Sequence, residues 1–320
     1  MSDALRLVDV WKRYAAHLAV RGLTLTAPSG CIYGILGPNG AGKSTTLRMV
    51  MNIIARDSGA IEVLGRAPDA RGALRSVGYL PEERGLYRRM RVIDLLVFFG
   101  RLKGMSAAAA RRDGAVWLER LGLADWRGAR LETLSKGMQQ KVQFITTVLH
   151  HPELLILDEP YAGLDPVNQE VLRETILRTR AEGGTVVLST HNMNQAEALC
   201  DAVCIIAGGS KLLDGSVREV KRRHRGERYR LQLDAATSTP ESAKAIEDGL
   251  QGMVARLERS AGDMCWDLDL NGRPARAVLE TIARLPVQLE RFERLQPSLH
   301  EIFIQEVGVA ARHAAKVADA

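Results

Sequence analysis

Short apolar runs alternate with helical patterns over the first 223 residues of the chain. Residues 5–10 alternate apolar and polar side chains, as a strand buried on one face does. A helical pattern follows at residues 44–54. Three largely apolar segments predict central strands buried on both faces: residues 31–36, 154–157 and 185–190. Shorter strands are expected at 61–65 and 77–80. This alternation predicts an α/β fold with a parallel sheet.

Residues 92–150 form a mainly helical segment between two of the predicted strands. Apolar positions recur there at helical spacing, and the hydroxyl of Ser106 suits a helix N-cap. Pro152 breaks the last helix. We therefore expect a helical subdomain inserted into the α/β domain, which a hairpin at 203–213 and a helix at 216–223 complete.

The composition changes at a charged junction near residues 221–230. Beyond it, the apolar pattern indicates strand, helix, strand, strand, helix and strand between residues 229 and 292, followed by a helix at 299–307. That order is the ferredoxin-like arrangement. We expect three parts: the α/β domain at 1–223, a small α+β ferredoxin-like domain at 224–309 and a flexible tail at 310–320.

A glycine-rich loop joins the strand at 31–36 to the helix behind it. It matches the P-loop pattern G-x-x-x-x-G-K-[ST], in which backbone N–H groups and the positive end of the next helix converge on phosphate oxygens. Lys43 is expected to reach the β- and γ-phosphates of a nucleotide, and Ser44 to offer its hydroxyl to Mg²⁺. The predicted binding residues are Gly37, Pro38, Asn39, Gly40, Ala41, Gly42, Lys43, Ser44 and Thr45.

Acidic side chains stand at the end of the buried run 154–157. A central parallel strand delivers the residues at its carboxyl end to a ligand. We expect Asp158 to hold Mg²⁺ through its water shell and Glu159 to polarise the water that attacks the γ-phosphate. His191 ends another buried strand and could contact the γ-phosphate, although a lone histidine is more often structural. Tyr14 suits base stacking or is a plain surface tyrosine, and its position alone does not separate the two.

Composition narrows the class of protein. Hydrophobic residues make up 46% of the chain and charged residues 26%, and no run of eighteen apolar residues occurs, so we expect no membrane span. Met1-Ser2-Asp3 leads directly into a strand pattern, which favours a cytosolic location. The cysteines lack the spacing of a metal site or a disulfide framework and are expected to be reduced: Cys31, Cys200, Cys204 and Cys265.

The net charge of +6 is unevenly distributed. Residues 1–223 contain 31 Lys and Arg against 23 Asp and Glu, whereas residues 224–320 contain 13 against 15. A basic first domain could favour an anionic membrane surface or a nucleic acid. A solvated arginine-rich face on a nucleotide-binding domain explains the same excess and is the interpretation we favour.

Taken in order, these motifs resemble the ATP-binding subunit of an ABC transporter over residues 3–223. Leu134-Ser135-Lys136-Gly137-Met138 stands where the family signature usually reads LSGGQ. The other matches are Tyr14 as the adenine-stacking aromatic, residues 37–45 as Walker A, 154–159 as Walker B, 163–165 as the D-loop and His191 as the switch histidine.

The sequence departs from the family pattern at the signature and at the Q-loop. The signature keeps Ser135 and Gly137, which the resemblance implies contact a γ-phosphate, but has Lys136 and Met138 at two other positions. Glu82 replaces the usual Q-loop glutamine, and its carboxylate is still able to bind Mg²⁺ or water. With the segments 78–87 and 298–303, these variants resemble the branch that serves type-2 export permeases, including sodium- and drug-efflux systems.

The resemblance implies a head-to-tail dimer, or pseudo-dimer, in which each P-loop faces the partner's signature across a bound ATP. It also implies a separate integral membrane permease, which we expect to dock on the loop at 82–91, and a peripheral place on the cytoplasmic face of the inner membrane. Two alternatives stay open. One is a soluble ABC ATPase that acts on the ribosome or a nucleic acid. Ribosome-acting members carry two ATP modules in one chain and DNA-repair members contain long coiled coils, whereas this chain has one module and no sustained heptads. The other is an inactive regulatory module, which Lys43, Asp158, Glu159 and His191 oppose.

Overall fold

A computed structural model describes residues 3–83, 85–260, 264–270 and 272–318, with side chains described as far as residue 308. The chain divides into two compact units, Met1–Val220 together with Phe303–Ala320, and Lys221–Ile302. Each unit has its own cluster of buried hydrophobic residues. No helix among the described residues has the length and apolar character needed to cross a membrane.

A six-stranded sheet of order β5-β6-β7-β3-β8-β9 forms the centre of the first unit. The five strands from β5 to β8 run parallel, and β9 pairs antiparallel with β8. Every residue of β3, β6 and β7 is buried, as expected for strands covered on both faces. The strands are β3 (Ile32–Leu36), β5 (Val77–Leu80), β6 (Leu154–Asp158), β7 (Thr185–Thr190), β8 (Ala202–Ala207) and β9 (Ser210–Ser216). The predicted α/β fold with a parallel sheet is confirmed.

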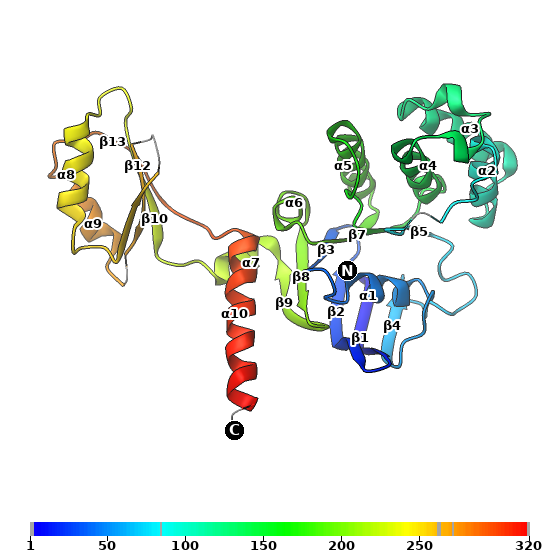
Figure 1. The fold of residues 1–320 in the computed structure, drawn as a ribbon, viewed down its shortest axis with the longest axis horizontal. Helices are drawn as coiled ribbons and strands as arrows, with labels where there is room; N and C mark the ends of the chain where they lie inside the picture. The colour runs from blue at the N-terminus through cyan, green and yellow to red at the C-terminus, as the bar shows by residue number, and fades with distance from the viewer. Residues whose placement is uncertain (1–2, 84, 261–263, 271, 319–320) are drawn as a thin grey trace. The chain divides into compact units, whose positions relative to one another are not determined.

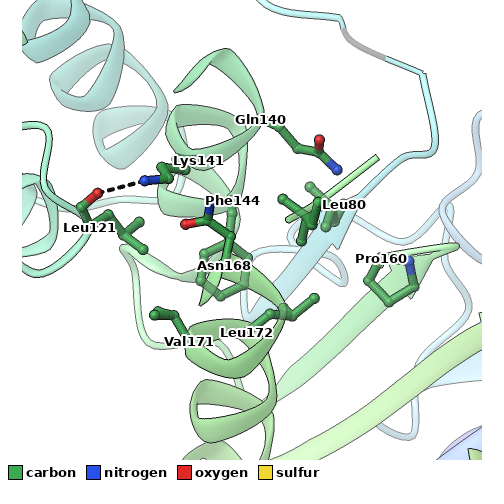
Figure 2. Close-up of a pocket in the computed structure, with 10 residues that line it drawn as sticks. Leu80, Leu121, Gln140, Lys141, Phe144, Pro160, Asn168, Val171 and Leu172 are labelled. Carbon is green, nitrogen blue, oxygen red and sulfur yellow. Dashed lines mark hydrogen bonds between the residues drawn. The ribbon is translucent and has the colours of Figure 1, made fainter. Parts of the chain in front are cut away.

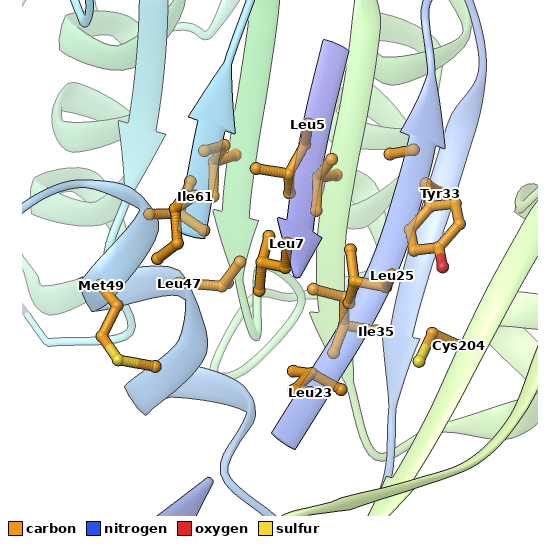
Figure 3. Packing of buried hydrophobic residues seen from close by; sticks show 14 of the residues in the cluster. Leu5, Leu7, Leu23, Leu25, Tyr33, Ile35, Leu47, Met49, Ile61 and Cys204 are labelled. Carbon is orange, nitrogen blue, oxygen red and sulfur yellow. The ribbon is translucent and has the colours of Figure 1, made fainter. Parts of the chain in front are cut away.

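An antiparallel sheet of order β2-β1-β4 joins the same core. It consists of β1 (Asp3–Tyr14), β2 (His17–Pro28) and β4 (Ser58–Val63), of which β2 is absent from the sequence-based expectation. Helix α1 (Lys43–Val50) contacts strands of both sheets and ends four residues earlier than its apolar pattern predicts. Figure 3 shows side chains of β1 and α1 meeting in this core, among them Leu5, Leu7 and Leu47.

The segment between β5 and β6 is helical, as expected, and its helices group beyond the β5 end of the sheet (Figure 1). Ser106 caps α3, because its hydroxyl accepts a hydrogen bond from the N–H of Ala109. The segment contains α2 (Val92–Leu102), α3 (Ala107–Arg120), α4 (Lys136–Val148) and the 3₁₀ turns η1 (Ala124–Trp126) and η2 (Leu131–Thr133). The rest of the unit adds α5 (Pro166–Ala181), α6 (Met193–Leu199) and the predicted α7 (Val217–Arg223), which extends into the second unit.

The second unit has the predicted ferredoxin-like element order. Its sheet has the order β11-β12-β10-β13 with antiparallel neighbours throughout. Trp266 is fully buried at the centre of its core. The elements are β10 (Arg228–Leu233), α8 (Pro240–Leu250), β11 (Arg256–Arg259), β12 (Cys265–Asp269), α9 (Ala275–Ile282) and β13 (Leu289–Arg294). The strand order, with the first strand of the motif at the centre, is the ferredoxin-like arrangement.

The segment from residue 310, which was expected to be a flexible tail, is helical for most of its length. Helix α10 (Leu299–Ala318) continues through it to Ala318. The segment is rich in alanine and contains neither proline nor glycine after Gly308, so its intrinsic helix propensity is high. The expectation gave too little weight to this propensity.

One side of β5 pairs with β6, and α4 covers the other side, where the sheet ends. The two backbones come so close that a Cβ on Gly78 would lie 2.4 Å from the carbonyl oxygen of Thr147. His150, two residues beyond α4, has its Nε2 3.3 Å from the carbonyl oxygen of Val77. Lys103 donates to the same carbonyl at 2.6 Å. Burial, followed by the charge of Lys103, lowers the pKa of His150 to about 4.

Because His150 is neutral in the folded state, acid should destabilise the protein through it. A histidine in an unfolded chain has a pKa near 6.5, so between about pH 6.5 and pH 4 the unfolded state binds a proton that the folded state does not. The free energy of unfolding should therefore fall by up to about 3 kcal/mol over that interval as the pH is lowered. Chemical denaturation at a series of pH values measures this slope.

His150→Gln, which keeps an amide donor for Val77, should flatten the slope between about pH 6.5 and pH 4. The matched control is His151→Gln, which changes the neighbouring histidine, whose side chain is 74% exposed; it should change the slope less than His150→Gln does. Equal slopes in the two variants would show that His150 is not the titrating group.

Candidate functional site

The loop between β3 and α1 presents an open row of backbone donors. Within the described part of the chain, these groups donate no hydrogen bond: the N–H groups of Gly40, Gly42, Lys43 and Ser44. Gly42 has a φ of 100°, and a Cβ on it would lie 2.5 Å from the carbonyl oxygen of Ala19. Only glycine suits that position. Unpaired N–H groups at the start of a helix are suited to bind an anion such as phosphate.

Lys43 is a buried cation shared by three oxygens. Its side chain is 6% exposed, and its Nζ donates to the carbonyl oxygens of Gly37 at 2.8 Å and Pro38 at 3.2 Å. The same Nζ lies 3.2 Å from Oε1 of Glu159, an ion pair whose angle falls outside hydrogen-bond geometry. A buried ammonium in contact with the phosphate loop supplies the positive charge that a phosphate group needs.

Asp158, at the end of β6, is 1% exposed and receives hydroxyl donors from two directions. Its Oδ1 accepts from the hydroxyl of Ser44 at 3.0 Å and from the hydroxyl of Ser189 at 2.5 Å. Its Oδ2 is buried and has no hydrogen-bond partner among the described residues. A carboxylate oxygen without a partner, beside a serine hydroxyl, fits a hard cation such as Mg²⁺. The structure thus brings together Ser44 and Asp158, two of the three predicted metal-binding residues; the third is Glu82.

Glu159 and His191 form a second pair at the ends of β6 and β7. Nδ1 of His191 lies 3.1 Å from Oε2 of Glu159, and the imidazole is 59% exposed. Glu159 has a φ of 47°, a left-handed conformation that costs energy in a residue with a side chain. Ser189 holds that backbone in place, because its hydroxyl and its carbonyl oxygen accept from the N–H of Glu159 at 3.1 and 3.2 Å. The carboxylate of Glu159 therefore lies between a buried cation and an exposed imidazole.

Glu82 belongs to the same site, although its side chain is exposed. It lines one cavity together with Asp158, Glu159 and Gln143. A second, largely apolar cavity shares Leu80 and Gln140 with the first and lies between α4 and α5 (Figure 2). The position expected from the Q-loop match is therefore close to the strand-end carboxylates.

Other predicted site residues lie outside this cluster. Ser135 caps α4 by accepting from the N–H of Met138 at 3.3 Å, and no atom lies within 4 Å of the place where a Cβ on Gly137 would stand. No hydrogen bond among the described residues joins either one to the P-loop. Tyr14, at the end of β1, is 44% exposed, and Nζ of Lys12 lies 5.5 Å from its ring centre. Their roles stay predictions.

The sequence analysis missed Ser189 and Gln143. Ser189 is fully buried in β7 and contacts both Asp158 and the backbone of Glu159. A serine directly after the apolar run 186–188, near the carboxyl end of the strand, was the available signal. Gln143 is 4% exposed within α4 and bonds to the loop that contains Glu82. A glutamine on the buried face of a helix was the corresponding signal.

A phosphate loop between strand and helix, with two carboxylates at the end of a nearby parallel strand, defines a P-loop nucleotide hydrolase. Two family models match the chain. The model "ABC transporter" matches residues 20–162, and the model "ATP-binding protein DrrA1-3-like, C-terminal domain" matches residues 215–307.

Relatives match the chain over nearly its whole length. The "Uncharacterized ABC transporter ATP-binding protein YhaQ" of Bacillus subtilis (strain 168) is 38% identical over 312 residues, which are 95% of this chain and 98% of that protein. The "Nod factor export ATP-binding protein I" of Rhizobium sp. (strain N33) is 33% identical over 308 residues, 95% and 97% of the two chains.

A solved structure, "Structure of ATP binding subunit of ABC transporter", is 30% identical with a TM-score of 0.65, covering 69% of this chain and 93% of that one. The chain belongs to the ABC transporter family of ATP-binding proteins. The predicted family is thereby confirmed, and the family implies ATP binding and hydrolysis.

Gly42→Ala should impair nucleotide binding, because the new methyl group must move the loop away from Ala19. We expect ATP affinity to fall by at least about tenfold, or about 1.4 kcal/mol. Titration with a fluorescent ATP analogue measures the change. Gly30→Ala is the control, since Gly30 also has a positive φ, of 76°, but no atom lies within 4 Å of its Cβ position. Similar losses of affinity in both variants would indicate a general effect of backbone strain.

Proposed function

We propose that this chain is the ATP-binding and ATP-hydrolysing subunit of an ABC exporter that drives a separate membrane permease. The observation that carries the proposal is a pair of contacts beside Asp158: Lys43 forms an ion pair with Glu159, and Glu159 in turn contacts His191. These contacts place a cation, a base and an imidazole around an open phosphate loop. The relative named for Nod factor export supports the direction of transport. The comparisons give no support to the alternative that acts on the ribosome or a nucleic acid.

In this proposal the residues divide the work of hydrolysis. Bound ATP with Mg²⁺ supplies the phosphoanhydride to be cleaved and the charge that offsets its phosphates. Lys43 and the loop N–H groups bind the phosphates, while Ser44, Asp158 and Glu82 hold the metal. Glu159 orients the attacking water and accepts its proton. His191 fixes the carboxylate of Glu159 and, being exposed, is able to contact the γ-phosphate.

The proposal requires two ATP-binding domains, each completing the other's site. Ser135 is exposed at the beginning of α4, and the space around Gly137 is open, so both are available to a second molecule. The amino end of α4 carries partial positive charge, as does that of α1. A γ-phosphate held between these two helix ends belongs to two chains at once, which explains a dimer that forms around ATP.

Dimer formation should depend on nucleotide. Glu159→Gln removes the proposed general base, so bound ATP is not hydrolysed and persists. Size-exclusion chromatography of this variant with ATP and Mg²⁺ should show nearly complete conversion to dimer. Lys43→Ala, which lacks the phosphate-binding cation, should stay monomeric under the same conditions. A Glu159→Gln variant that binds ATP but remains monomeric would contradict the proposed sandwich. A chain that binds no ATP would contradict the proposed function itself.

The permease is proposed to dock where an aromatic cluster joins the loop 82–91 to α2. Tyr87 is 56% exposed, and its ring centre lies 5.5 Å from that of Phe98 and 6.4 Å from that of Phe99. Arg88 stands beside it in the sequence. Exposed aromatic side chains next to arginine are typical of protein interfaces. We propose that the working subunit sits peripherally on the cytoplasmic face of the inner membrane, held there by the permease.

Substituting Tyr87 and Arg88 together with alanine should uncouple the subunit from its permease. We expect the isolated chain to keep ATP hydrolysis within about twofold of wild type, while export by the assembled transporter falls by more than about tenfold through loss of anchoring contacts. Val116→Ala, which changes an exposed residue of α3 in the helical segment that follows the loop, is the control and should affect neither. Loss of hydrolysis in the isolated chain would place these residues in the nucleotide site instead.

A further inference from the structure

Helix α4 closes the edge of the central sheet by hydrogen bonds from its side chains. β5 is the terminal strand, so the carbonyl groups on its outer side have no neighbouring strand. Side chains of α4 and of the residues just after it reach these carbonyls: the hydroxyl of Thr147 lies 3.3 Å from Tyr79 O and 3.0 Å from Gln143 O in its own helix, so its proton is shared between them, and His150 contacts Val77 O. Gln143 bonds farther along the same segment, beyond the end of β5.

The spacing of these residues matches the geometry of both elements. Gln143 and Thr147 are four residues apart, which puts them on one face of α4, and His150 follows three residues later, just beyond the end of the helix. The carbonyls of Val77 and Tyr79 are two residues apart, which puts them on one edge of a strand. Side chains of α4 and His150 therefore lie along the outward carbonyl groups of β5, where the backbone of another strand would otherwise bond.

Gln143 forms the contact of this row that lies closest to the nucleotide site. Its Nε2 donates to the carbonyl oxygen of Glu83 at 3.2 Å and lies 3.4 Å from that of Pro81. These two carbonyls flank Glu82 on both sides in the sequence. Gln143 is 4% exposed, so water does not compete freely for these bonds. The same glutamine lines the cavity that contains Glu82, Asp158 and Glu159.

Helix α4 connects this contact to the signature. Ser135 caps the helix, and Gln143 follows eight residues later, about 12 Å along the axis at 1.5 Å per residue. A rotation of α4 that moves Ser135 and Gly137 also moves Gln143, because a helix of this length is stiff. The loop around Glu82 is bonded to Gln143 and has to follow it or lose both bonds.

We propose that Gln143 is a positioning residue that places Glu82 at the metal site and links this placement to the orientation of α4. The inference rests on the proposed function, since it assigns the carboxylate of Glu82 to Mg²⁺ bound with ATP. Glu82 has an exposed side chain on a loop, so its place near Asp158 depends on how its backbone is held. Gln143 holds that backbone on both sides. Metal binding at the nucleotide and the position of the signature helix then influence each other.

The test is the Mg²⁺ dependence of binding of a fluorescent trinitrophenyl-ATP in variants that separate position from stability. Gln143→Leu removes the donor at similar volume. It should raise the Mg²⁺ concentration for half-maximal enhancement of binding by about threefold to tenfold, the equivalent of a lost hydrogen bond. Thr147→Val is the matched control, because it removes a donor one turn away that bonds to Tyr79. It should lower the melting temperature but shift the Mg²⁺ dependence by less than about twofold.

A double-mutant cycle decides whether Gln143 acts through Glu82. Glu82→Gln alone should also raise the half-maximal Mg²⁺ concentration, and adding Gln143→Leu to it should cause less than about twofold further change. A full additional shift in the Glu82→Gln background would overturn the proposal, as would equal shifts in Gln143→Leu and Thr147→Val. Gln143→Met replaces the leucine variant if the latter does not fold.

The wild-type titration separates this inference from the proposed function. Wild-type protein without any Mg²⁺-dependent nucleotide binding, at the level of Lys43→Ala, would reject the proposed function. Wild-type binding that depends on Mg²⁺, combined with a Gln143→Leu curve identical to it, would reject the role of Gln143 alone.

Discussion

The structure of the site depends on a buried ion pair between strands that are not neighbours. Lys43 follows β3 and Glu159 follows β6, with β7 between them in the sheet. The two side chains are 6% and 10% exposed, so each loses most of its hydration and depends on the other for charge. The cation is compensated further by two loop carbonyls, whereas Glu159 contacts His191. Truncating one of the two residues leaves the charge of the other buried and uncompensated. A bound phosphate can replace Glu159 as the partner of Lys43, and a bound metal ion can replace Lys43 as the partner of Glu159.

The middle strand makes this pairing possible through Ser189. Its hydroxyl bonds to Asp158 and accepts from the N–H of Glu159, so one small side chain fixes both carboxylates at the end of β6. The left-handed conformation of Glu159 turns its side chain toward Lys43 and His191, and the hydrogen bonds from β7 offset its cost. The contact of Ser189 with the end of β6 therefore fixes the positions of Asp158 and Glu159 and stabilises the strained backbone of Glu159. This is why Ser189 belongs to the site although it lies outside the known motifs.

The sequence was sufficient wherever the information is local. The P-loop, the apolar strands with acids at their ends and the cap at Ser106 each involve a few consecutive residues, whose chemistry permits one arrangement. Strand β2 was not predicted from its pattern, and the helix from residue 310 was taken for a flexible tail. Ser189 and Gln143 were missed for a different reason, because their importance comes from a partner far away in the chain. A hydrogen bond between a side chain and the edge of a distant strand produces no periodic pattern in the sequence.

The edge of the sheet shows why such contacts carry function as well as stability. An exposed strand edge can be protected by charged side chains or covered by a loop or a helix. Here the cover is α4, which begins within the segment 134–138 that matches the signature. Its buried face carries Gln143 and Thr147, and His150 follows just beyond its end. Because one helix both closes the sheet and begins at the exposed Ser135, a movement of its first turn changes hydrogen bonds along β5 and the loop after it. That loop contains Glu82, which lines one cavity with Asp158 and Glu159, so the edge of the sheet connects the capped end of α4 with the carboxylates at the end of β6.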